Sequence, residues 1–237
     1  MRLPPLRPGR ILRRYKRFLA DVELHNGTVV VAHCPNTGSM ASCWRPGAPV
    51  ELSYHDSPRR RLNWTLERVD MGRGWVGVHT GRVNAVIREA VQRGQIGALS
   101  GYREILGEPR FDNPLHPRAR LDLLLRGGRQ ANAYVEVKNA TLLVGDAVRF
   151  PDAVTERGRK HLQLLTLAAR QGYRAAIVFA INRPEGRVFE PARDIDPQYA
   201  DALEAAAQAG VMVIAARLHH SAHGIAVRGC AAFPAGT

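Results

Sequence analysis

Cysteine, acidic residues and long apolar runs are scarce in this chain of 237 residues. Its three cysteines, Cys34, Cys43 and Cys230, are too few and too scattered for a disulfide framework, and they suit a reducing compartment. No apolar stretch approaches the roughly 20 residues of a membrane-spanning helix. The basic residues 1–17 lack the apolar core of a secretory signal. We therefore expect a cytoplasmic protein that does not bind a membrane.

A zinc module is also not expected. The residues nearest to a zinc pattern are His33, Cys34, Cys43 and His55. Their spacing and order match no common zinc module. The sequence likewise gives no reason to expect an organic cofactor.

Positive charge is abundant, with 34 basic and 21 acidic residues and a formal net charge of +13. Residues 1–80 contain 13 basic and 6 acidic residues, a net charge of +7, while residues 81–237 have a net charge of +6. The first part is therefore about twice as basic per residue. Such an excess favours polyanions, and DNA, double- or single-stranded, is the expected partner.

The first 80 residues have the pattern of a small β-barrel. Five strand-like runs are separated by turn residues: 11–24, 28–33, 48–54, 62–69 and 74–79. Five short strands in this space predict an OB-like barrel. We place this nucleic-acid-binding domain at residues 1–82 and a second domain at residues 83–237.

Barrels of this kind bind nucleic acid through basic grooves and stacked aromatic rings. Residues 13–18 interleave basic and aromatic side chains, and three arginines precede Trp64. The alternative is that Phe18 and Trp64 belong to the core and the arginines are solvated. The candidate contacts are Arg13, Arg14, Lys16, Arg17, Arg59, Arg60 and Arg61.

The loop 35–40 is small and polar and lies between strand-like runs. Its amides and hydroxyls, with Asn36, Thr37 and Ser39 as the candidates, could cradle a phosphate. A tight structural turn is the alternative.

Two apolar runs in the second half carry charged residues, Asp122 in the first and Glu136 and Lys138 in the second. Side chains alternate along a strand, so Glu136 and Lys138 share a face. A hairpin with Asp122 opposite Glu136 leaves a five-residue loop, 127–131, and brings two carboxylates and one ammonium together. This arrangement predicts a site for Mg²⁺ or Mn²⁺ and phosphodiester hydrolysis, and a solvated ion pair is the alternative.

Lysine is rare, since only Lys16, Lys138 and Lys160 occur among the basic residues. Unlike arginine, lysine has a compact charge and a pKa that burial readily lowers, which suits Lys138 for handling a water. Pro151 and Asp152 predict a helix start, and on that helix Lys160 and Gln163 are neighbours. They are candidates for phosphate contact beside the carboxylates, with a solvated basic turn as the alternative.

The remaining elements predict a mixed sheet with helices on its faces. Asn84 is expected to cap a helix that ends at Gly94, and Glu89 and Glu108 are candidates for a third carboxylate. Later elements are a strand at 175–181, a helix at 197–209 and a strand at 211–216. The histidines near the C-terminus are expected to be exposed: His219, His220 and His223.

This order of elements resembles the PD-(D/E)XK nuclease superfamily, and the chain more closely resembles the sugar fermentation stimulation protein A family. The resemblance implies an N-terminal OB-like barrel, a C-terminal nuclease-like domain and DNA binding. One departure is Ala119, where family members often have serine, and it leaves the aspartate assignment intact. The matching stretches are residues 31–40, 118–125, 134–138, 150–162 and 191–197.

We thus predict a two-domain α+β protein that binds DNA and has an endonuclease-like site. Asp122, Glu136 and the Val137 carbonyl would hold the metal, and Lys138 would orient a water or stabilise the developing charge. One alternative is a non-catalytic DNA-binding regulator of sugar (maltose) metabolism genes that retains the fold. A weaker alternative is an RNA-binding module. A homodimer is the candidate assembly.

Overall fold

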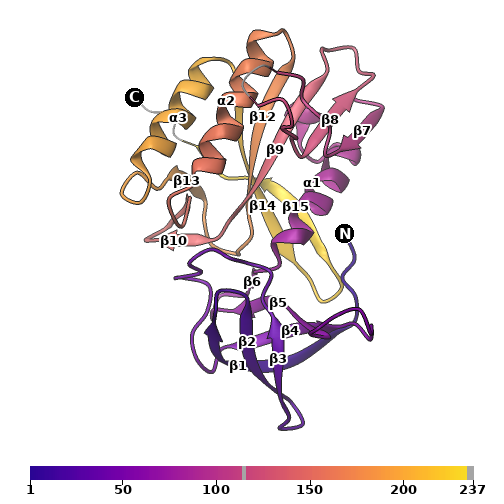
Figure 1. Ribbon diagram of the computed structural model, residues 1–237, viewed down its shortest axis with the longest axis vertical. Coiled ribbons are helices and arrows are strands. Elements are labelled where there is room, and N and C mark those ends of the chain that lie inside the picture. The colour runs from indigo at the N-terminus through magenta and orange to yellow at the C-terminus, as the bar shows by residue number, and fades with distance from the viewer. Residues whose placement is uncertain (114–115, 234–237) are drawn as a thin grey trace.

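The N-terminal strands form a closed barrel, seen at the bottom of Figure 1. The computed structural model describes residues 1–113 and 116–233. The strands run in the order β3-β2-β1-β4-β5-β6, and parallel pairing of β3 with β5 closes a five-stranded barrel. Their bounds are β1 Leu6–Tyr15, β2 Leu19–Leu24, β3 Val29–His33, β4 Pro49–Tyr54, β5 Trp64–Asp70 and β6 Trp75–Gly77.

The predicted strand at 11–24 is wrong, because two strands occupy this run. The chain reverses at Lys16 and Arg17, which both have left-handed backbone conformations with φ of 49° and 64°. The turn contains no glycine, proline or asparagine, so the sequence carries no ordinary turn signal there. The reversal leaves Phe18 exposed at the tip of the hairpin rather than in the core.

The second domain is built on a mixed six-stranded sheet in the order β15-β14-β12-β9-β8-β7. A small sheet of β10, β11 and β13 lies beside it. The bounds are β7 Glu104–Gly107, β8 Leu123–Arg126, β9 Ala133–Ala140, β10 Leu142–Val144, β11 Ala147–Phe150, β12 Arg174–Ile181, β13 Val188–Pro191, β14 Met212–His220 and β15 Ile225–Cys230.

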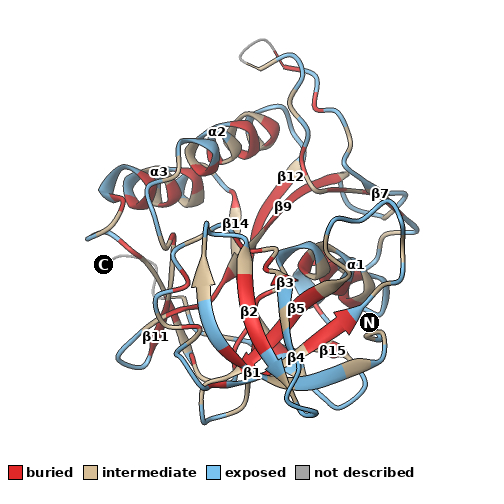
Figure 2. Ribbon diagram, turned by 60° about the horizontal axis from the view of Figure 1, so that its bottom comes forward, coloured by how far each residue is buried: buried red, intermediate tan, exposed pale blue. Residues whose placement is uncertain are grey.

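Helices cover both faces of this sheet. One face packs on α1, Val83–Gln92, and the other on α2, Glu156–Arg170, and α3, Pro197–Gln208. Single 3₁₀ turns occupy Thr80–Arg82 and Gly97–Leu99. The central strands β9 and β12 are therefore buried on both faces, as their near-continuous apolar sequence indicates (Figure 2).

Alternation along β9 decides which helix each side chain meets. Val135 and Val137 pack in the cluster that includes α1, whereas Tyr134 packs in the cluster that includes α2 and α3. Glu136 and Lys138 share the face of Tyr134 and so point to the α2 side.

Both predicted helix starts are wrong. Helix α2 begins at Glu156, and its N-cap Thr155 accepts a hydrogen bond from the Gly158 amide. Asp152 does not cap it, because its carboxylate is bound by the barrel loop. Helix α1 begins one residue before Asn84, which lies inside the helix and uses its side chain elsewhere.

Polar contacts join the two domains. The Arg68 guanidinium, 2% exposed, donates to Glu51 in the barrel and to the Ser221 carbonyl in the second domain at 2.7 Å. The Gly77 amide donates to the Asn182 carbonyl at 2.8 Å. Because buried polar groups need their partners, these bonds favour one relative placement of the domains.

His220 contradicts the expectation of exposed C-terminal histidines. It lies in β14, its Nε2 is 2.6 Å from Asn182 Oδ1, and its Nδ1 is buried without a hydrogen-bond partner. Of these three histidines, His219 and His223 are exposed. In the described part of the chain, no helix is long and apolar enough to cross a membrane.

Candidate functional site

The β8–β9 hairpin has the predicted register. Leu123 pairs with Val135 and Leu125 pairs with Ala133. One step further along the same register, Asp122 stands opposite Glu136. Asp122 itself lies just before β8, where the regular ladder ends.

The Asp122 carboxylate continues the ladder with its side chain. Its Oδ2 accepts a hydrogen bond from the Val137 amide at 2.7 Å, and its Oδ1 accepts one from Asn84 Nδ2 at 2.7 Å. The amide and carbonyl of one strand residue point to the same edge, so the Val137 carbonyl is directed to the edge where Asp122 lies. Asn84 was expected to cap a helix, and it instead positions the aspartate.

Glu136 lies 2% exposed beneath α2. Its Oε1 contacts Lys138 Nζ at 2.6 Å and also His161 Nδ1, while Lys138 Nζ lies 3.1 Å from His161 Nδ1. Its Oε2 is buried without a hydrogen-bond partner. A buried carboxylate oxygen without a donor is costly, and a bound cation would satisfy it.

The two carboxyl groups differ in acidity. Burial and the neighbouring charge of Glu136 raise the pKa of Asp122, against the bonds from Val137 and Asn84. Burial also raises the pKa of Glu136, but the hydrogen bond from His161 and the charge of Lys138 outweigh it, and the net pKa is lowered. Two carboxylates that repel each other in a poorly solvated place are suited to a divalent cation.

His161, like Asn84, is a site residue that the sequence does not predict. The prediction chose its neighbours Lys160 and Gln163 on the same helix, and both of these are exposed. One feature of the sequence could have indicated His161. The strand face that carries Glu136 and Lys138 must pack against a covering helix, so a side chain of that helix must contact them. The rotation of α2 on the sheet then selected position 161 rather than 160.

The structure does not group a third carboxylate with these residues. Glu89 binds the Met1 amino group and Arg93 instead. Glu108 is adjacent to Asp122 through its backbone amide, at 2.9 Å, but its side chain is exposed and its φ is 49°. Within residues 1–113 and 116–233, no group of three His, Cys, Asp or Glu side chains is arranged to hold a metal.

A cleft of about 460 Å³ opens beside the site, between the barrel and the second domain. Asn84, Val137 and Lys138 line one side of it, and the barrel loop and the β11–α2 connection line the others. Lys160 and Gln163 are not among its lining residues. The polar lining includes Asn36, Thr37, Thr80, Asn139, Thr141, Arg149, Asp152, Thr155 and Arg157.

The barrel loop 36–40 binds a carboxylate of the protein, that of Asp152. Ser39 Oγ and the Met40 amide both donate to Asp152 Oδ2 at 3.3 Å. Asn36 is buried and its Oδ1 accepts from the Gly38 amide at 3.0 Å, whereas Thr37 is exposed. The loop therefore has the donors that a phosphate needs, and the Asp152 carboxylate uses two of them.

Arg14 braces the same loop from β1. Its guanidinium donates to the carbonyls of Asn36 and Gly38, both at 2.9 Å, and of Arg17 at 2.7 Å. Arg13 is exposed, pairs with Asp21 at 2.6 Å and lies over the Tyr15 ring. The two arginines of β1 that are predicted to bind nucleic acid thus differ in their availability. Arg13 is exposed, whereas the Arg14 guanidinium is already bonded to backbone carbonyls.

Other predicted basic residues come together on the barrel surface. Lys16, Arg60 and Arg61 line a groove of about 580 Å³ with Phe18, which is 46% exposed. Arg17 and Arg59 are exposed in the adjacent turns. Trp64 instead packs against the barrel core, 4.8 Å from Tyr54 between ring centroids. The exposed ring beside this groove is therefore Phe18.

Residues 12–78 match the family called SfsA N-terminal OB domain, and residues 81–224 match the sugar fermentation stimulation protein RE domain. A sugar fermentation stimulation protein homolog from Geotalea uraniireducens is 47% identical over 230 residues, which cover 97% of each chain. A homolog from Halorhodospira halophila is 50% identical over 226 residues, which cover 93% of this chain and 92% of that one.

A solved structure is also similar to this one. It is titled the structure of Pyrococcus furiosus SfsA in complex with Ca²⁺, and it is 29% identical with a TM-score of 0.87. The similarity covers 98% of this chain and 97% of that chain. Both domains thus have counterparts in one family, in the same order. The chain belongs to the SfsA family of sugar fermentation stimulation proteins.

Proposed function

We propose that this protein binds DNA and hydrolyses phosphodiester bonds with the help of Mg²⁺ or Mn²⁺. The observation that carries the proposal is the β8–β9 register, which places Asp122 opposite Glu136. The Glu136 carboxylate contacts Lys138, and Lys138 lines a polar cleft between the domains. Charged groups buried together need a reason, and a hard cation with a phosphate supplies one.

The residues present fit a divalent cation. Asp122, the free oxygen of Glu136 and the Val137 carbonyl offer oxygen ligands of the kind that Mg²⁺ and Mn²⁺ prefer. A relative of the same fold is titled as a complex with Ca²⁺, another hard cation that takes oxygen ligands. When bound, such a cation polarises the phosphodiester and lowers the pKa of a water.

Residues of the protein would position the metal ligands, the water and the phosphate. Lys138, with its side chain 14% exposed, would orient the attacking water or stabilise charge on the phosphate. Asn84 holds Asp122, and His161 holds Glu136, so both act as positioning residues. Arg157 lines the same cleft and offers a guanidinium group to a neighbouring phosphate, whereas Arg149 in this cleft is paired with Glu190 and Asp194.

DNA binding is proposed to depend mainly on the barrel. Lys16, Arg60 and Arg61 surround the exposed Phe18 ring, which can stack on a base, as OB-folds do with single strands. The family placement supports this assignment for the barrel domain. Because these contacts are to phosphates and base faces, we expect little sequence preference.

A DNA-binding regulator without catalysis is the second candidate. The observation that favours it is the contact of Glu136 Oε1 with both Lys138 and His161. Lys138 neutralises the charge of Glu136 without a metal, and His161 contacts the same carboxylate oxygen. In that case the site would stabilise the fold and the barrel would act alone.

Calorimetry with Mn²⁺, together with cleavage assays on plasmid, single-stranded and branched DNA, separates the two candidates. The wild type should bind Mn²⁺ and cut at least one of these forms. Asp122→Asn should abolish metal binding, because it removes a charge that attracts the cation. Lys138→Met should keep metal affinity and lose cleavage.

Asp56→Asn is the matched control, since Asp56 is exposed on the barrel and should behave as the wild type. If the wild type binds no divalent ion at millimolar concentration, with or without DNA, the hydrolase proposal fails and the regulator is retained. Metal binding without cleavage of any of the three DNA forms would also count against hydrolysis.

A further inference from the structure

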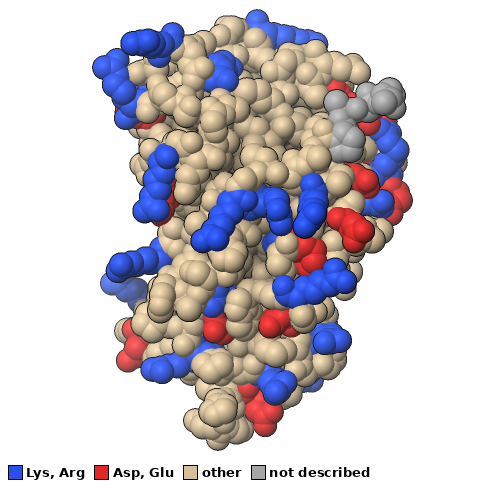
Figure 3. Space-filling view, turned by 180° about the vertical axis from the view of Figure 1, so that it is seen from behind, with Lys and Arg blue, Asp and Glu red and all other residues tan. Residues whose placement is uncertain are grey.

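A second concavity, of about 490 Å³, lies at the junction of the domains and shares no lining residue with the cleft of the candidate site. The barrel contributes Arg73, from the turn between β5 and β6. The second domain contributes Arg217 of β14, Asp146 and the loop 184–188, which includes Arg187. Basic side chains lie on both domains and around the middle of the face seen from behind (Figure 3).

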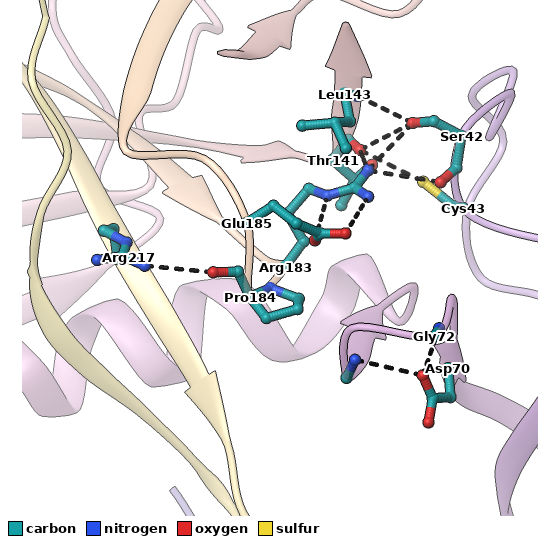
Figure 4. Close-up of polar contacts among 11 residues, drawn as sticks. Ser42, Cys43, Asp70, Gly72, Thr141, Leu143, Arg183, Pro184, Glu185 and Arg217 are labelled. Atoms are coloured by element: carbon teal, nitrogen blue, oxygen red, sulfur yellow. Dashed lines mark hydrogen bonds and ion pairs between the residues drawn. The ribbon is translucent and has the colours of Figure 1, made fainter. Parts of the chain in front are cut away.

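The loop from the second domain is held rigidly. The Arg183 guanidinium, 2% exposed, donates to the Thr141 carbonyl at 2.7 Å, to Ser42 Oγ at 3.1 Å and to both oxygens of Glu185 (Figure 4). This single buried group thus ties the loop to both domains. It also neutralises Glu185, so that this carboxylate does not cancel the charge of the other arginines.

The barrel turn is held as well. Asp70 Oδ1 accepts from the Gly72 amide at 2.7 Å and from the Gly74 amide at 3.3 Å (Figure 4). Gly74 lies against Pro184, since a Cβ added there would be 3.5 Å from the proline ring. A turn fixed on both sides therefore presents Arg73 at the rim. Burial raises the pKa of Glu185, but the hydrogen bonds from Arg183 outweigh it, and the charge of Arg73 adds to the net lowering.

Three guanidinium groups of this pocket have hydrogen-bonding capacity to spare. Among the described residues, Arg73 and Arg187 make no side-chain hydrogen bond, and Arg217 makes one, to the Pro184 carbonyl at 3.2 Å. The Nε of Arg217 is buried without a partner. A buried N–H donor without an acceptor is rare in native proteins, and a bound group with an acceptor oxygen would satisfy it.

We propose that this pocket binds a phosphoryl group. Guanidinium groups from three separate segments can each meet a different oxygen of a tetrahedral oxyanion, which a planar carboxylate does not offer. The pocket, at about 490 Å³, has room for an organic part beside the phosphoryl group. Such a ligand is either a nucleic-acid backbone or end, or a small phosphorylated molecule. The site is independent of the metal site and of hydrolysis.

The test uses the metal-free full-length protein and inorganic phosphate as the probe, with binding measured by calorimetry at constant ionic strength. The wild type should bind phosphate in the millimolar range, and Arg217→Ala should weaken binding by about 10-fold, the loss of one charge-assisted contact. Arg73→Ala and Arg187→Ala should weaken it in the same direction. Arg129→Ala is the control, because Arg129 is exposed on the β8–β9 loop and lies outside this pocket.

Two results would overturn the proposal: no phosphate binding by the folded wild type, or equal binding by the Arg217, Arg187 and Arg129 variants. Circular dichroism establishes that each variant is folded. Asp122→Asn should bind phosphate as the wild type does, which separates this site from the proposed hydrolase. If a short single-stranded oligonucleotide displaces phosphate, the ligand is nucleic acid. If ribose 5-phosphate displaces it and the oligonucleotide does not, the ligand is a small phosphorylated molecule.

Discussion

The barrel and the second domain carry their functional charges in opposite environments. On the barrel, Lys16, Arg17 and Arg61 are exposed around an open groove. In the second domain, Glu136 is 2% exposed and its contact Lys138 is largely covered. Water and salt screen the field of an exposed charge, whereas a buried charge is screened little and depends strongly on the few groups that pair with it. The barrel should therefore tolerate single substitutions that the buried site does not.

Replacing Glu136 with Gln is the strongest test of this contrast. The amide keeps the shape of the side chain and removes a charge that a divalent cation needs, so we expect Mn²⁺ affinity to fall by about 100-fold or more. Titration calorimetry measures the change. Glu23→Gln removes an exposed carboxylate on β2 and serves as the control. Equal Mn²⁺ affinity of the two variants would contradict the role of Glu136.

At the domain junction, a buried and an exposed group are adjacent in the sequence: His220 is largely buried and His219 is exposed. Burial and the charge of Arg68 lower the pKa of His220 to about 4, from about 6.5 in an unfolded chain. The folded state therefore binds this proton more weakly than the unfolded state does. The stability that neutral His220 contributes is complete above about pH 6.5 and is lost as the pH falls toward 4.

We expect this loss to be on the order of 2 kcal/mol, after allowance for partial solvent screening. Urea unfolding at several pH values between 7.5 and 4.5 measures it. His220→Gln should flatten this part of the pH dependence, and His219→Gln, at an exposed position, should leave it unchanged. The same pH dependence in both variants would show that His220 is not the titrating group.

Asn84 tests whether the buried site depends on positioning residues as well as on the metal ligands. It would not contact the cation itself, and it acts through its hydrogen bond to Asp122. Asn84→Ala removes one of the two hydrogen bonds that orient this carboxylate, so Mn²⁺ affinity should fall by about 10-fold. Gln92→Ala, an exposed position on the same helix, should keep full affinity. A variant of Asn84 with normal affinity would mean that Val137 alone positions Asp122.

The smallest effects are expected on the barrel. Arg17→Ala or Arg61→Ala should weaken DNA binding a few-fold and reduce the slope of log affinity against log salt by about 1. Arg14→Ala should leave the slope unchanged and lower the stability by about 1–2 kcal/mol, because its guanidinium holds loop carbonyls. Filter binding at several salt concentrations measures the slopes, with Arg129→Ala as the control. If Arg14→Ala also reduces the slope of log affinity against log salt, Arg14 contacts a phosphate, as the sequence predicts.

Local patterns were sufficient for much of this protein. The alternation of side chains and the glycine turn predicted the register that places Asp122 opposite Glu136, and β8 and β9 confirm it. Short strand-like runs with turn residues predicted the barrel, and the strand at 175–181 and the helix at 197–209 are present within a residue or two. These features succeed because strand pairing in a hairpin and amphipathic periodicity depend on residues close in sequence.

Tertiary structure decided what lies against these elements. His161 meets Glu136 only because α2 packs at one rotation on the sheet, and Asn84 meets Asp122 only because α1 covers the opposite face. Arg73 and Arg217 come from different domains and line one pocket only because of how the domains dock. Local patterns therefore specify most of the strands, the register of the β8–β9 hairpin and the charged residues that this hairpin carries. The groups that contact them lie far away in the chain, with 25 positions between Glu136 and His161 and 38 between Asp122 and Asn84. No local pattern specifies such contacts, because they depend on the packing of the whole core.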